Sequence, residues 1–288
     1  MTINRCVVVI KQTALARGGR VARLARSGDA TACRLLSASD EHHCTIAEVR
    51  DALARQQLAF TEFPLQQITA AARRAIAAAD LVITIGGDGT VLGSSHYVRQ
   101  GMLLGVNSAP GDSVGYFCHA TRLTFARRLA DILAARWRPV ELARLAVTLA
   151  GKTLPQLALN DVLIAHDCPA ATTRYLLSVG SHEEEQRSSG LWVSTAAGST
   201  AGIHSAGGAV LPKRSRRLQY LVRELYREPG RCYRLTHGFI APGHEIGIAS
   251  KMPQAHLYLD GARTAYPFPF GARAVVRPAD HGLRIFLT

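Results

Sequence analysis

Apolar runs and polar breaks divide the chain into two halves that meet near Pro139. In the first half, Cys6–Ile10, Leu81–Ile85 and Met102–Val106 are short, continuous apolar runs, which are typical of strands buried on both faces. Leu58–Phe63 is a further strand candidate. Longer polar and Ala-rich stretches separate these runs. Strands that alternate with helices predict a parallel sheet covered by helices on both faces.

Three of the intervening stretches carry helix signals. Thr45–Glu48 has the Thr-x-x-Glu pattern of a capping box, so a helix is expected to begin there. Ile68–Ala79 is rich in alanine without a helix breaker, and Thr121–Arg136 places apolar residues on one face. The His-His-Cys sequence at residues 42–44 has adjacent side chains rather than the spacing of metal ligands. We expect a solvated loop there.

The second half is predicted to be mostly β. Its apolar runs are short, turn residues separate them, and no long amphipathic helix interrupts them before Ser199. These runs are Leu145–Leu149, Ala158–Ala165, Tyr175–Val179 and Leu191–Ser194. We therefore expect a Rossmann-like α/β domain over residues 1–138 and a β-rich, sandwich-like domain over residues 139–265.

Composition places the chain among ordered globular proteins. With 288 residues it can bury two moderate cores, and 48% apolar with 19% charged residues argues against disorder. No apolar stretch reaches membrane length, and the first one is too short for a signal peptide. The six cysteines are scattered without a CxxC pair, so no disulfide framework is expected. The expectation is a cytoplasmic protein with no membrane partner.

The net charge of +13 comes almost entirely from arginine. Such a basic chain raises nucleic-acid binding as a hypothesis. The arginines are spread along the chain, however, and the densest basic run, Lys213–Arg217, has only Tyr220 as a nearby aromatic residue. No zinc finger, RNA-recognition signature or clear helix-turn-helix accompanies it. We expect no nucleic-acid partner, and a positive field that attracts small polyanions such as nucleotides.

The sequence Gly86-Gly87-Asp88-Gly89-Thr90 follows a predicted buried strand, at the edge where open α/β sheets place ligands. Glycines let backbone N–H groups approach an anion, and a helix beginning at Thr90 would favour phosphate. Asp88 could deprotonate an attacking hydroxyl or organise Mg²⁺ around ATP. The alternative is a plain β-turn, because Asp-Gly is a common turn pair. The spacing fits neither a P-loop nor a dinucleotide fingerprint.

Two further motifs combine small and polar residues. From Arg187 to Gly208, small and hydroxylic residues let a flat ligand lie against the backbone while hydroxyls bond ribose or phosphate. A Gly/Ser linker is the alternative there. Asn160 and Asp161 form a polar pair between apolar strand residues. An amide beside a carboxylate suits ribose hydroxyls or the amino edge of adenine, with an Asx-capped strand end as the alternative.

The three motifs resemble the NAD kinase family when they are taken in chain order: GGDGT, then the Asn160-Asp161 pair, then the small and hydroxylic segment. The resemblance runs from about Val82 to Gly208, and includes Gly105–Asn107 and, near the end, Asp260-Gly261. The segments around Arg187 and Asn160 most resemble the plant-type NADH kinase branch. GGDGT alone is shared with lipid kinases and, loosely, with phosphofructokinases. The combination therefore carries the resemblance.

The resemblance implies an α/β domain followed by an all-β domain, with residues 266–288 returning to the first. It implies ATP with Mg²⁺, NAD or NADH as acceptor, no dedicated metal ligands, and a homodimer or homotetramer. Asp88 matches the family's catalytic acid. The residues that match nucleotide-contacting positions are Gly86, Gly87, Gly89, Thr90, Asn107, Asn160, Asp161, Arg187, Ser189, Thr195, Ser199, Thr200, Ala201, Gly202, His204, Ser205 and Asp260.

Three positions depart from the family pattern. Ser189 stands where many members have Asp, Gly202 replaces the Tyr of GSTAY, and Ala262 replaces a common Gln. All three lie where the family meets its dinucleotide. Loss of a carboxylate near the ring would remove a partner for cationic nicotinamide, which favours NADH as a hypothesis. Phosphorylation of a lipid or sugar, and a non-catalytic nucleotide-binding role, are the alternatives.

Overall fold

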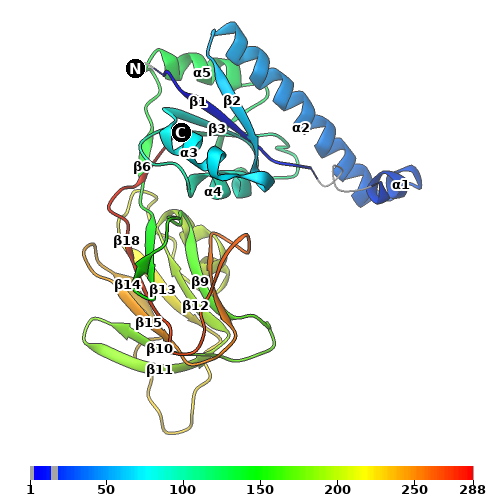
Figure 1. Ribbon diagram of the computed structural model, residues 1–288. Helices are drawn as coiled ribbons and strands as arrows, with labels where there is room; N and C mark the ends of the chain where they lie inside the picture. The colour runs from blue at the N-terminus through cyan, green and yellow to red at the C-terminus, as the bar shows by residue number, and fades with distance from the viewer. Residues whose placement is uncertain (1–2, 14–18, 288) are drawn as a thin grey trace. The chain divides into compact units, whose positions relative to one another are not determined.

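The computed structural model describes residues 3–13 and 19–287 and divides the chain into two compact units. The α/β unit contains the residues up to Val140 together with those from Leu283 onward, and the β-rich unit runs from Glu141 to Gly282 (Figure 1). The structure has the fold class predicted from the sequence. The return to the first unit was expected at residue 266, but it begins at Leu283 because two further strands pair within the β-rich unit.

A mainly parallel sheet forms the centre of the α/β unit. Its strands follow the order β2-β1-β3-β4-β19-β6, and β5 pairs with β4. The pairs β1/β2, β1/β3, β3/β4, β4/β5 and β4/β19 are parallel. The strands are β1 (Cys6–Ile10), β2 (Phe60–Pro64), β3 (Leu81–Gly86), β4 (Met102–Asn107), β5 (Cys118–Thr121), β6 (Val140–Leu142) and β19 (Leu283–Ile285).

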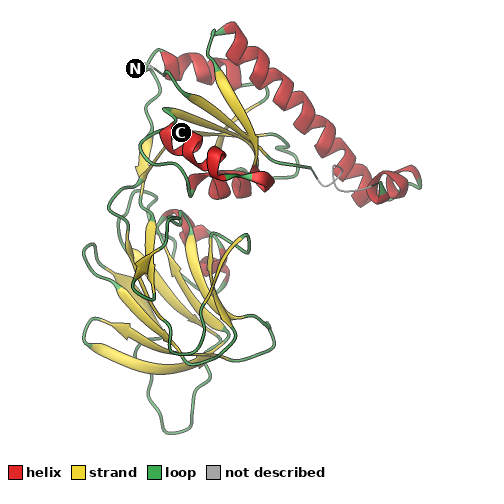
Figure 2. Ribbon diagram, viewed as in Figure 1, coloured by secondary structure: helices red, strands yellow, loops and turns green. Residues whose placement is uncertain are grey.

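Helices pack on this sheet, as Figure 2 shows. Asp29 and Thr69 cap the starts of α2 and α3, because their side chains accept the N–H groups of Ala32 and Ala72 at 2.7 and 3.2 Å. Apolar faces of α2 and α5 join β1, β3 and β4 in one core. The helices are α1 (Arg20–Arg26), α2 (Ala30–Arg55), α3 (Ala70–Ala78), α4 (Asp88–Ser95) and α5 (Phe125–Leu133), with a 3₁₀ turn at Leu65–Gln67.

The start of α2 was predicted incorrectly. The loop expected at residues 42–44 lies inside the helix, and His42 is buried rather than solvated. Thr45, expected as the helix start, lies within the helix and donates its hydroxyl to the Glu41 carbonyl at 2.8 Å. The first half of α2 presents few apolar residues to the core. Its apolar spacing becomes visible only in the second half, where the sequence pattern placed the start.

The β-rich unit contains two antiparallel sheets that share one hydrophobic core. Their orders are β11-β10-β15-β18-β7-β8 and β14-β13-β12-β9-β16-β17. The strands are β7 (Leu145–Leu149), β8 (Lys152–Thr153), β9 (Asp161–His166), β10 (Thr173–Val179), β11 (His182–Ser188), β12 (Gly190–Ser194), β13 (Leu218–Arg223), β14 (His237–Ile240), β15 (Ile246–Ser250), β16 (Ala255–Leu259), β17 (Thr264–Pro267) and β18 (Arg273–Pro278). A 3₁₀ turn, Ala197–Thr200, and the short helix α6, Gly202–Ser205, follow β12.

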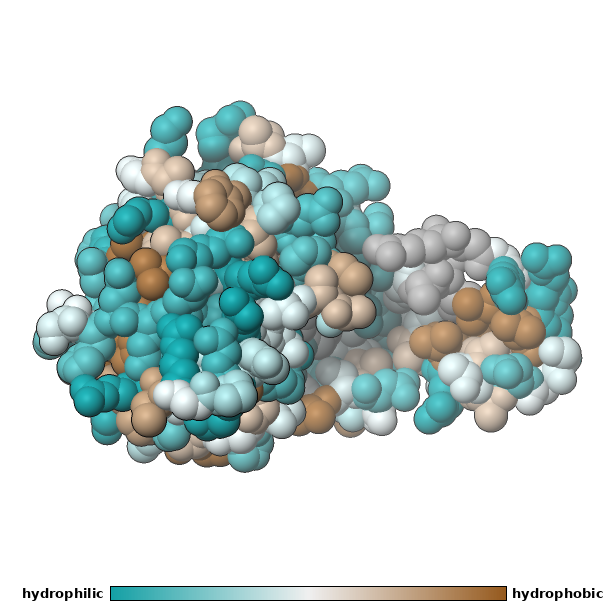
Figure 3. Space-filling view, turned by 90° about the horizontal axis from the view of Figure 1, so that it is seen from below, coloured by the Kyte–Doolittle hydropathy of each residue, from teal (hydrophilic) through white to brown (hydrophobic). Residues whose placement is uncertain are grey.

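The surface of the β-rich unit seen in Figure 3 is mostly hydrophilic, with apolar side chains scattered over it. The exposed large apolar residues of this unit include Val210, Tyr226, Phe239 and Phe270. Isolated apolar residues of this kind are normal on a protein surface. Within the described part of the chain, no helix combines the length and the apolar character that crossing a membrane requires.

Candidate functional site

The GGDGT turn lies at the carboxyl end of β3, between the ends of two neighbouring strands. Gly86 pairs directly with Asn107 at the end of β4, and on the other side the Lys11 N–H donates to the Ile85 carbonyl at 2.9 Å. Gly87 precedes α4, so that Asp88 occupies the first turn of this helix. The structure therefore brings together the predicted residues Gly86, Gly87, Asp88 and Asn107 at the ligand-binding edge of a parallel sheet.

The glycines of this turn serve different purposes. A Cβ at Gly87 would lie 2.6 Å from Ser113 Oγ, so a larger residue there would force this hydroxyl to turn away. Gly89 is exposed, and no atom lies within 4 Å of the position of its missing Cβ. The open approach to backbone that the sequence predicted is therefore found at Gly89, while Gly87 lies next to the Ser113 side chain.

The Asp88 carboxylate holds the loop after β4 in place. Oδ2 accepts the Tyr116 N–H at 2.9 Å, and Oδ1 accepts the Phe117 N–H at 2.7 Å. Asn107 fixes the start of the same loop, because its side chain donates to the Ser113 carbonyl at 3.0 Å. Each Asp88 oxygen retains a lone pair after these contacts. The carboxylate is thus oriented by the backbone and still able to accept a proton or bind a cation.

Sequence reasoning did not identify the support behind this turn. Buried His42 bridges two strand ends: its Nε2 lies 2.8 Å from the Lys11 carbonyl, and its Nδ1 lies 2.8 Å from Ser108 Oγ. Because a carbonyl only accepts, Nε2 carries the proton, and Nδ1 accepts the Ser108 hydroxyl in the neutral ring. The Ser108 N–H donates to the Gly86 carbonyl at 3.1 Å, which links His42 to the GGDGT turn.

A second cluster forms in the β-rich unit where β9 and β12 pair. Asp161 lies opposite Ser194, and Thr195 donates its hydroxyl to the Leu159 carbonyl at 2.6 Å. A Cβ at Gly198 would lie only 2.2 Å from the Asn160 carbonyl oxygen, so glycine is required for the turn after β12 to pack against this strand. The two polar motifs predicted from the sequence are therefore packed against one another.

Asp260 organises the backbone of this cluster. Its two carboxylate oxygens accept the N–H groups of Leu159, Asn160 and Asp161 at 2.7, 2.7 and 3.1 Å. Asp260 and Gly261 both have a positive φ, of 51° and 100°, in the turn after β16. The sequence assigned Asp260 to nucleotide contact. In the structure its carboxylate positions the Asn160-Asp161 pair.

The paired residues differ in what they offer a ligand. Burial, and to a lesser extent the neighbouring Asp260 carboxylate, raises the pKa of Asp161 to about 7. Near neutral pH this carboxyl group is therefore close to half protonated and can donate as well as accept. Asn160 Oδ1 is buried and has no hydrogen-bond partner among the described residues. An unsatisfied buried acceptor of this kind is typical of a site that a ligand completes.

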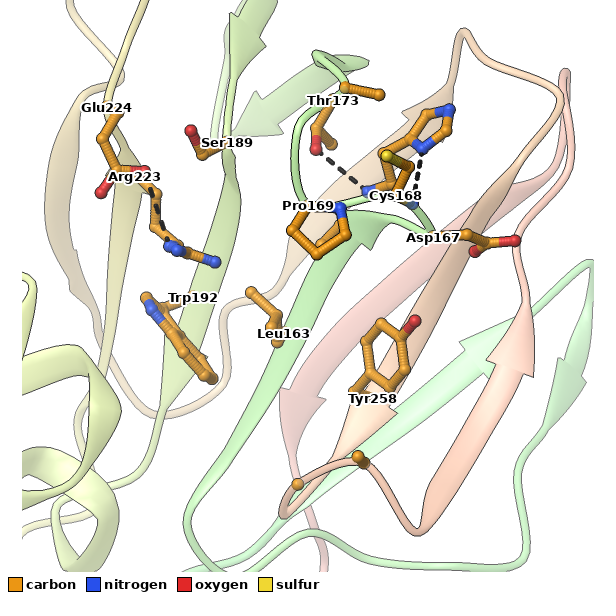
Figure 4. Close-up of a pocket in the computed structure, with 15 residues that line it drawn as sticks. Leu163, Asp167, Cys168, Pro169, Thr173, Ser189, Trp192, Arg223, Glu224 and Tyr258 are labelled. Carbon is orange, nitrogen blue, oxygen red and sulfur yellow. Dashed lines mark hydrogen bonds and ion pairs between the residues drawn. The ribbon is translucent and has the colours of Figure 1, made fainter.

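Two of the three family departures lie in one cavity of about 460 Å³ in the β-rich unit. Ser189 and Ala262 line it, and the third departure, Gly202, lies against Trp192, where a Cβ would be 3.0 Å from the indole ring. Figure 4 shows Trp192, Leu163 and Tyr258 around this cavity, with the Arg223 side chain near the indole. Its remaining lining residues are Ala165, His166, Asp167, Cys168, Pro169, Ala171, Thr173, Glu224 and Gly261.

The charged groups of this cavity are already paired. Arg223 lies 3.8 Å from Glu224 and 6.0 Å from the centre of the Trp192 ring, and Asp167 contacts His256. Ser189 is half-buried and donates its backbone N–H to the Arg223 carbonyl at 3.0 Å. The cavity therefore presents aromatic and apolar walls with no unpaired carboxylate at position 189.

The other predicted residues occupy different environments. Arg187 is exposed on β11 and pairs with Glu228 at 3.3 Å. Buried Ser199 accepts the Leu211 N–H at 2.9 Å, so it fixes the segment that follows α6. Five further residues are exposed or half-buried: Thr200, Ala201, Gly202, His204 and Ser205. Thr90 is buried and its hydroxyl packs beside Gly86.

The described residues contain no cluster of three or more His, Cys, Asp or Glu side chains suited to a metal ion. Mg²⁺ needs less from a protein when a nucleotide supplies phosphate oxygens, because one or two carboxylates and water complete its shell. The free lone pairs of Asp88 at the carboxyl edge of the sheet fit that requirement.

The α/β unit has a carboxylate in the GGDGT turn at the end of a parallel strand, and the β-rich unit has a cluster of polar residues around Asn160 and Asp161. Together these features define a phosphotransferase of the GGDGT class. A family model described as ATP-NAD kinase N-terminal domain matches residues 29–137. The chain is 36% identical over 232 residues to the NADH kinase of Arabidopsis thaliana, which covers 73% of each protein. It is 37% identical over 214 residues to a probable NADH kinase of Oryza sativa subsp. japonica, covering 67% of this chain and 66% of that protein. The chain therefore belongs to the NAD kinase family.

Solved structures show the same fold. The crystal structure of an NAD kinase from Archaeoglobus fulgidus in complex with ATP matches with a TM-score of 0.70 at 21% identity, covering 98% of this chain and 93% of that one. Yeast NADH kinase complexed with NADH matches with a TM-score of 0.72 at 14% identity, covering 100% of this chain and 84% of that one. The predicted family and fold class are both confirmed.

Replacing Asp260 with asparagine should destabilise the β-rich unit. One amide oxygen cannot replace two carboxylate oxygens, and the new NH₂ group would face backbone donors. We expect a loss of about 1.5–3 kcal/mol in the free energy of unfolding, which is typical of hydrogen bonds to a charged group. Urea denaturation would measure it, with Asp280→Asn as control because exposed Asp280 pairs only with a surface arginine. Equal stability of the two variants would contradict the positioning role.

His42 should make stability fall in mildly acidic solution. Burial lowers the pKa of His42, so the unfolded chain binds this proton more tightly. The stabilisation is complete above the unfolded-state pKa of about 6.5 and is lost as the pH falls through the folded-state pKa. In His42→Gln, the free energy of unfolding should change less between about pH 7.5 and about pH 5.5 than in the parent protein. His244→Gln, altered at an exposed histidine of the β-rich unit, should keep the parental slope.

Proposed function

We propose that this chain transfers the γ-phosphoryl group of ATP to the adenosine 2′-hydroxyl of NADH and NAD, with Asp88 as the catalytic residue. One observation carries the assignment of Asp88. Its carboxylate lies at the carboxyl end of β3, in the first turn of α4, and two backbone N–H groups fix its orientation. The chain's membership of the NAD kinase family and its likeness to NADH kinases support the reaction.

Phosphoryl transfer requires alignment and charge neutralisation more than covalent chemistry. Asp88 accepts or orients the proton of the attacking hydroxyl, and the N–H groups of Tyr116 and Phe117 keep the carboxylate aimed as that proton moves. The exposed backbone at Gly89 and the amino end of α4 offer the phosphates backbone N–H groups, which donate hydrogen bonds and do not ionise. The oxygen of the 2′-hydroxyl forms the new bond to phosphorus, and ADP leaves with the bond electrons.

Magnesium is part of the proposal. Asp88 and the triphosphate oxygens would hold it, and it supplies neutralisation of phosphate charge when it is bound. The basic character of the chain acts in the same direction over longer distances, because a net charge of +13 attracts polyanionic nucleotides.

The Asn160-Asp161 pair is proposed to bind the dinucleotide. The unpaired Oδ1 of Asn160 can accept from a ribose hydroxyl or from an adenine amino group. Asp161, with its raised pKa, can accept or donate near neutral pH. Thr195, Gly198 and Asp260 hold this pair through backbone contacts. A site that binds ligand hydroxyl groups through buried polar atoms discriminates strongly against an analogue that lacks these hydroxyls. Such an analogue leaves the buried atoms without a hydrogen-bond partner.

NADH is proposed as the preferred acceptor. The oxidised nicotinamide ring is cationic and the reduced ring is neutral, so an aromatic cavity without an unpaired carboxylate favours the reduced form. The cavity beside Ser189 has this character, since its arginine, glutamate and aspartate are engaged with one another or with His256. The names of the rice and Arabidopsis relatives, both described as NADH kinases, agree with this preference.

The oligomeric state and the location in the cell are two further properties that we propose. We infer a homodimer or homotetramer from the family resemblance, which molar-mass measurement in solution would test. We infer a cytoplasmic location, because each of the six cysteines is a free thiol and scattered thiols are typical of a reducing compartment.

A lipid or sugar kinase is disfavoured by the polar cluster of the β-rich unit. A non-catalytic regulator is disfavoured by the intact Asp88.

Replacing Asp88 with asparagine should reduce kcat by ~100-fold or more, because a positioned base contributes about 10²–10⁴-fold. The amide cannot take the proton of the attacking hydroxyl. Formation of NADP(H) from Mg-ATP and NAD(H) is the measurement. Asp112→Asn is the control, since Asp112 is exposed in the neighbouring loop. Near-parental activity of the Asp88 variant would remove this residue from the mechanism, provided that thermal unfolding shows both variants folded.

Introducing a carboxylate at position 189 should move the substrate preference towards NAD. Ser189→Asp would give the cationic ring a partner, so the ratio of kcat/KM for NAD to that for NADH should rise roughly tenfold, which corresponds to ~1.4 kcal/mol. Ser189→Asn has nearly the same shape without charge and should leave the ratio near its parental value. If both variants change the ratio equally, shape rather than charge sets the preference.

A further inference from the structure

Arg223 is the only lysine or arginine among the described residues that line the cavity of the β-rich unit. It is the last residue of β13, where it lies opposite Gly190 of β12, and its carbonyl accepts the Ser189 N–H at 3.0 Å. Ser189 stands where many family members have Asp. Arg223 is therefore a neighbour of the position at which the family pattern would place a negative charge.

The guanidinium group of Arg223 faces an aromatic wall of this cavity. Its Cζ lies 6.0 Å from the centre of the Trp192 ring, and Figure 4 shows the group turned towards the indole. A cation over an indole face is attracted by the ring, which holds the group in place without neutralising its charge. The Arg223 side chain is 31% exposed, so this charge lies in a wall that water reaches only in part.

Glu224 cancels only part of the charge on Arg223. The Nε atom of Arg223 lies 3.8 Å from a carboxylate oxygen of Glu224, which is too long for a hydrogen bond. The Glu224 side chain is 64% exposed, so water and salt screen it more than they screen the arginine. Asp167, the other acid on the cavity, contacts His256. The cavity wall around Trp192 therefore retains positive character.

A positive group in this wall distinguishes the two redox states of nicotinamide. The oxidised ring carries a positive charge and the reduced ring is neutral, while the rest of the dinucleotide is the same. Two like charges repel more strongly in a partly desolvated site than in bulk water. The indole face could attract a cationic ring, but Arg223 already supplies the cation that lies over it.

We propose that Arg223 is a specificity-determining residue, whose guanidinium group beside Trp192 repels the cationic ring of NAD and thereby selects NADH. The proposal rests on the proposed kinase function and on the proposed place of the nicotinamide ring in this cavity. It adds a second, separate cause of the preference. Serine at position 189 removes an attraction for the oxidised ring, whereas Arg223 supplies a repulsion.

Removing the charge tests the proposal. Arg223→Gln should raise the ratio of kcat/KM for NAD to that for NADH about threefold to tenfold, because two unit charges several ångströms apart in a partly exposed site interact by a small multiple of RT. The KM for NAD should fall, and the KM for NADH should stay within a factor of about two. Arg223→Lys keeps the charge and should keep the parental ratio.

Arg227→Gln is the matched control. It removes the same charge from an exposed residue that does not line the cavity, so it reports the effect of net charge alone. Salt separates repulsion from a packing role of the arginine. Between about 0.05 M and about 0.5 M salt, the NAD-to-NADH ratio of the parent protein should rise, because salt screens the repulsion. The ratio of the Arg223→Gln variant should stay nearly constant.

Binding without ATP separates this proposal from the proposed function. Calorimetric titration with NAD and with NADH should show the same shift in the ratio of the two Kd values for Arg223→Gln. An unchanged ratio in the folded variant, or an equal change in Arg227→Gln, would overturn the role of Arg223. A parent protein that binds NADH more tightly than NAD, and loses this preference in Arg223→Gln, but forms no NADP(H) from Mg-ATP would overturn the kinase function alone.

Discussion

The parallel pairing of β3 with both β1 and β4 is the constraint on which the α/β unit depends. Each strand is buried, so its backbone groups must find partners in the neighbouring strands. This pairing continues to Gly86, which lies opposite Asn107 and accepts a hydrogen bond from Ser108. The chain leaves the sheet at that point because no strand partner remains. Asp88 therefore emerges at one fixed position, with a helix beginning beneath it.

Both units use the same device to hold a polar turn. A single aspartate accepts several backbone N–H groups from a segment distant in sequence: Asp88 from residues 116 and 117, and Asp260 from residues 159 to 161. Loops of this kind have no ladder of their own, and a carboxylate satisfies donors that burial would otherwise leave unpaired. The two aspartates differ in consequence, because Asp88 remains next to the open backbone at Gly89, while Asp260 acts on the pair Asn160-Asp161.

Hydrogen bonding and burial restrain the acidic residues near the proposed sites in different ways. The overall positive charge favours the approach of nucleotides, and the acids that remain near the proposed sites are restrained by hydrogen bonds or by burial. Asp161 illustrates the second case: desolvation raises its pKa to about 7, so a carboxyl group in the proposed dinucleotide site can exist without a full negative charge. This limits repulsion with phosphate while retaining a directional hydrogen bond.

The sequence alone determined the alternation of strands and helices along the first half, the two-part organisation and the motifs, because continuous apolar runs and glycine-rich turns are local signals. Leu81–Ile85 and Met102–Val106 became β3 and β4 almost residue for residue. The first half of α2 had no such signal, and His42 was misplaced in a loop because its partners, Lys11 and Ser108, are distant in the chain. Only the tertiary structure could show that Asp260 supports the Asn160-Asp161 pair and that Ser189 and Ala262 share a cavity. Contacts between distant segments depend on how strands pair and pack, and no local pattern records them.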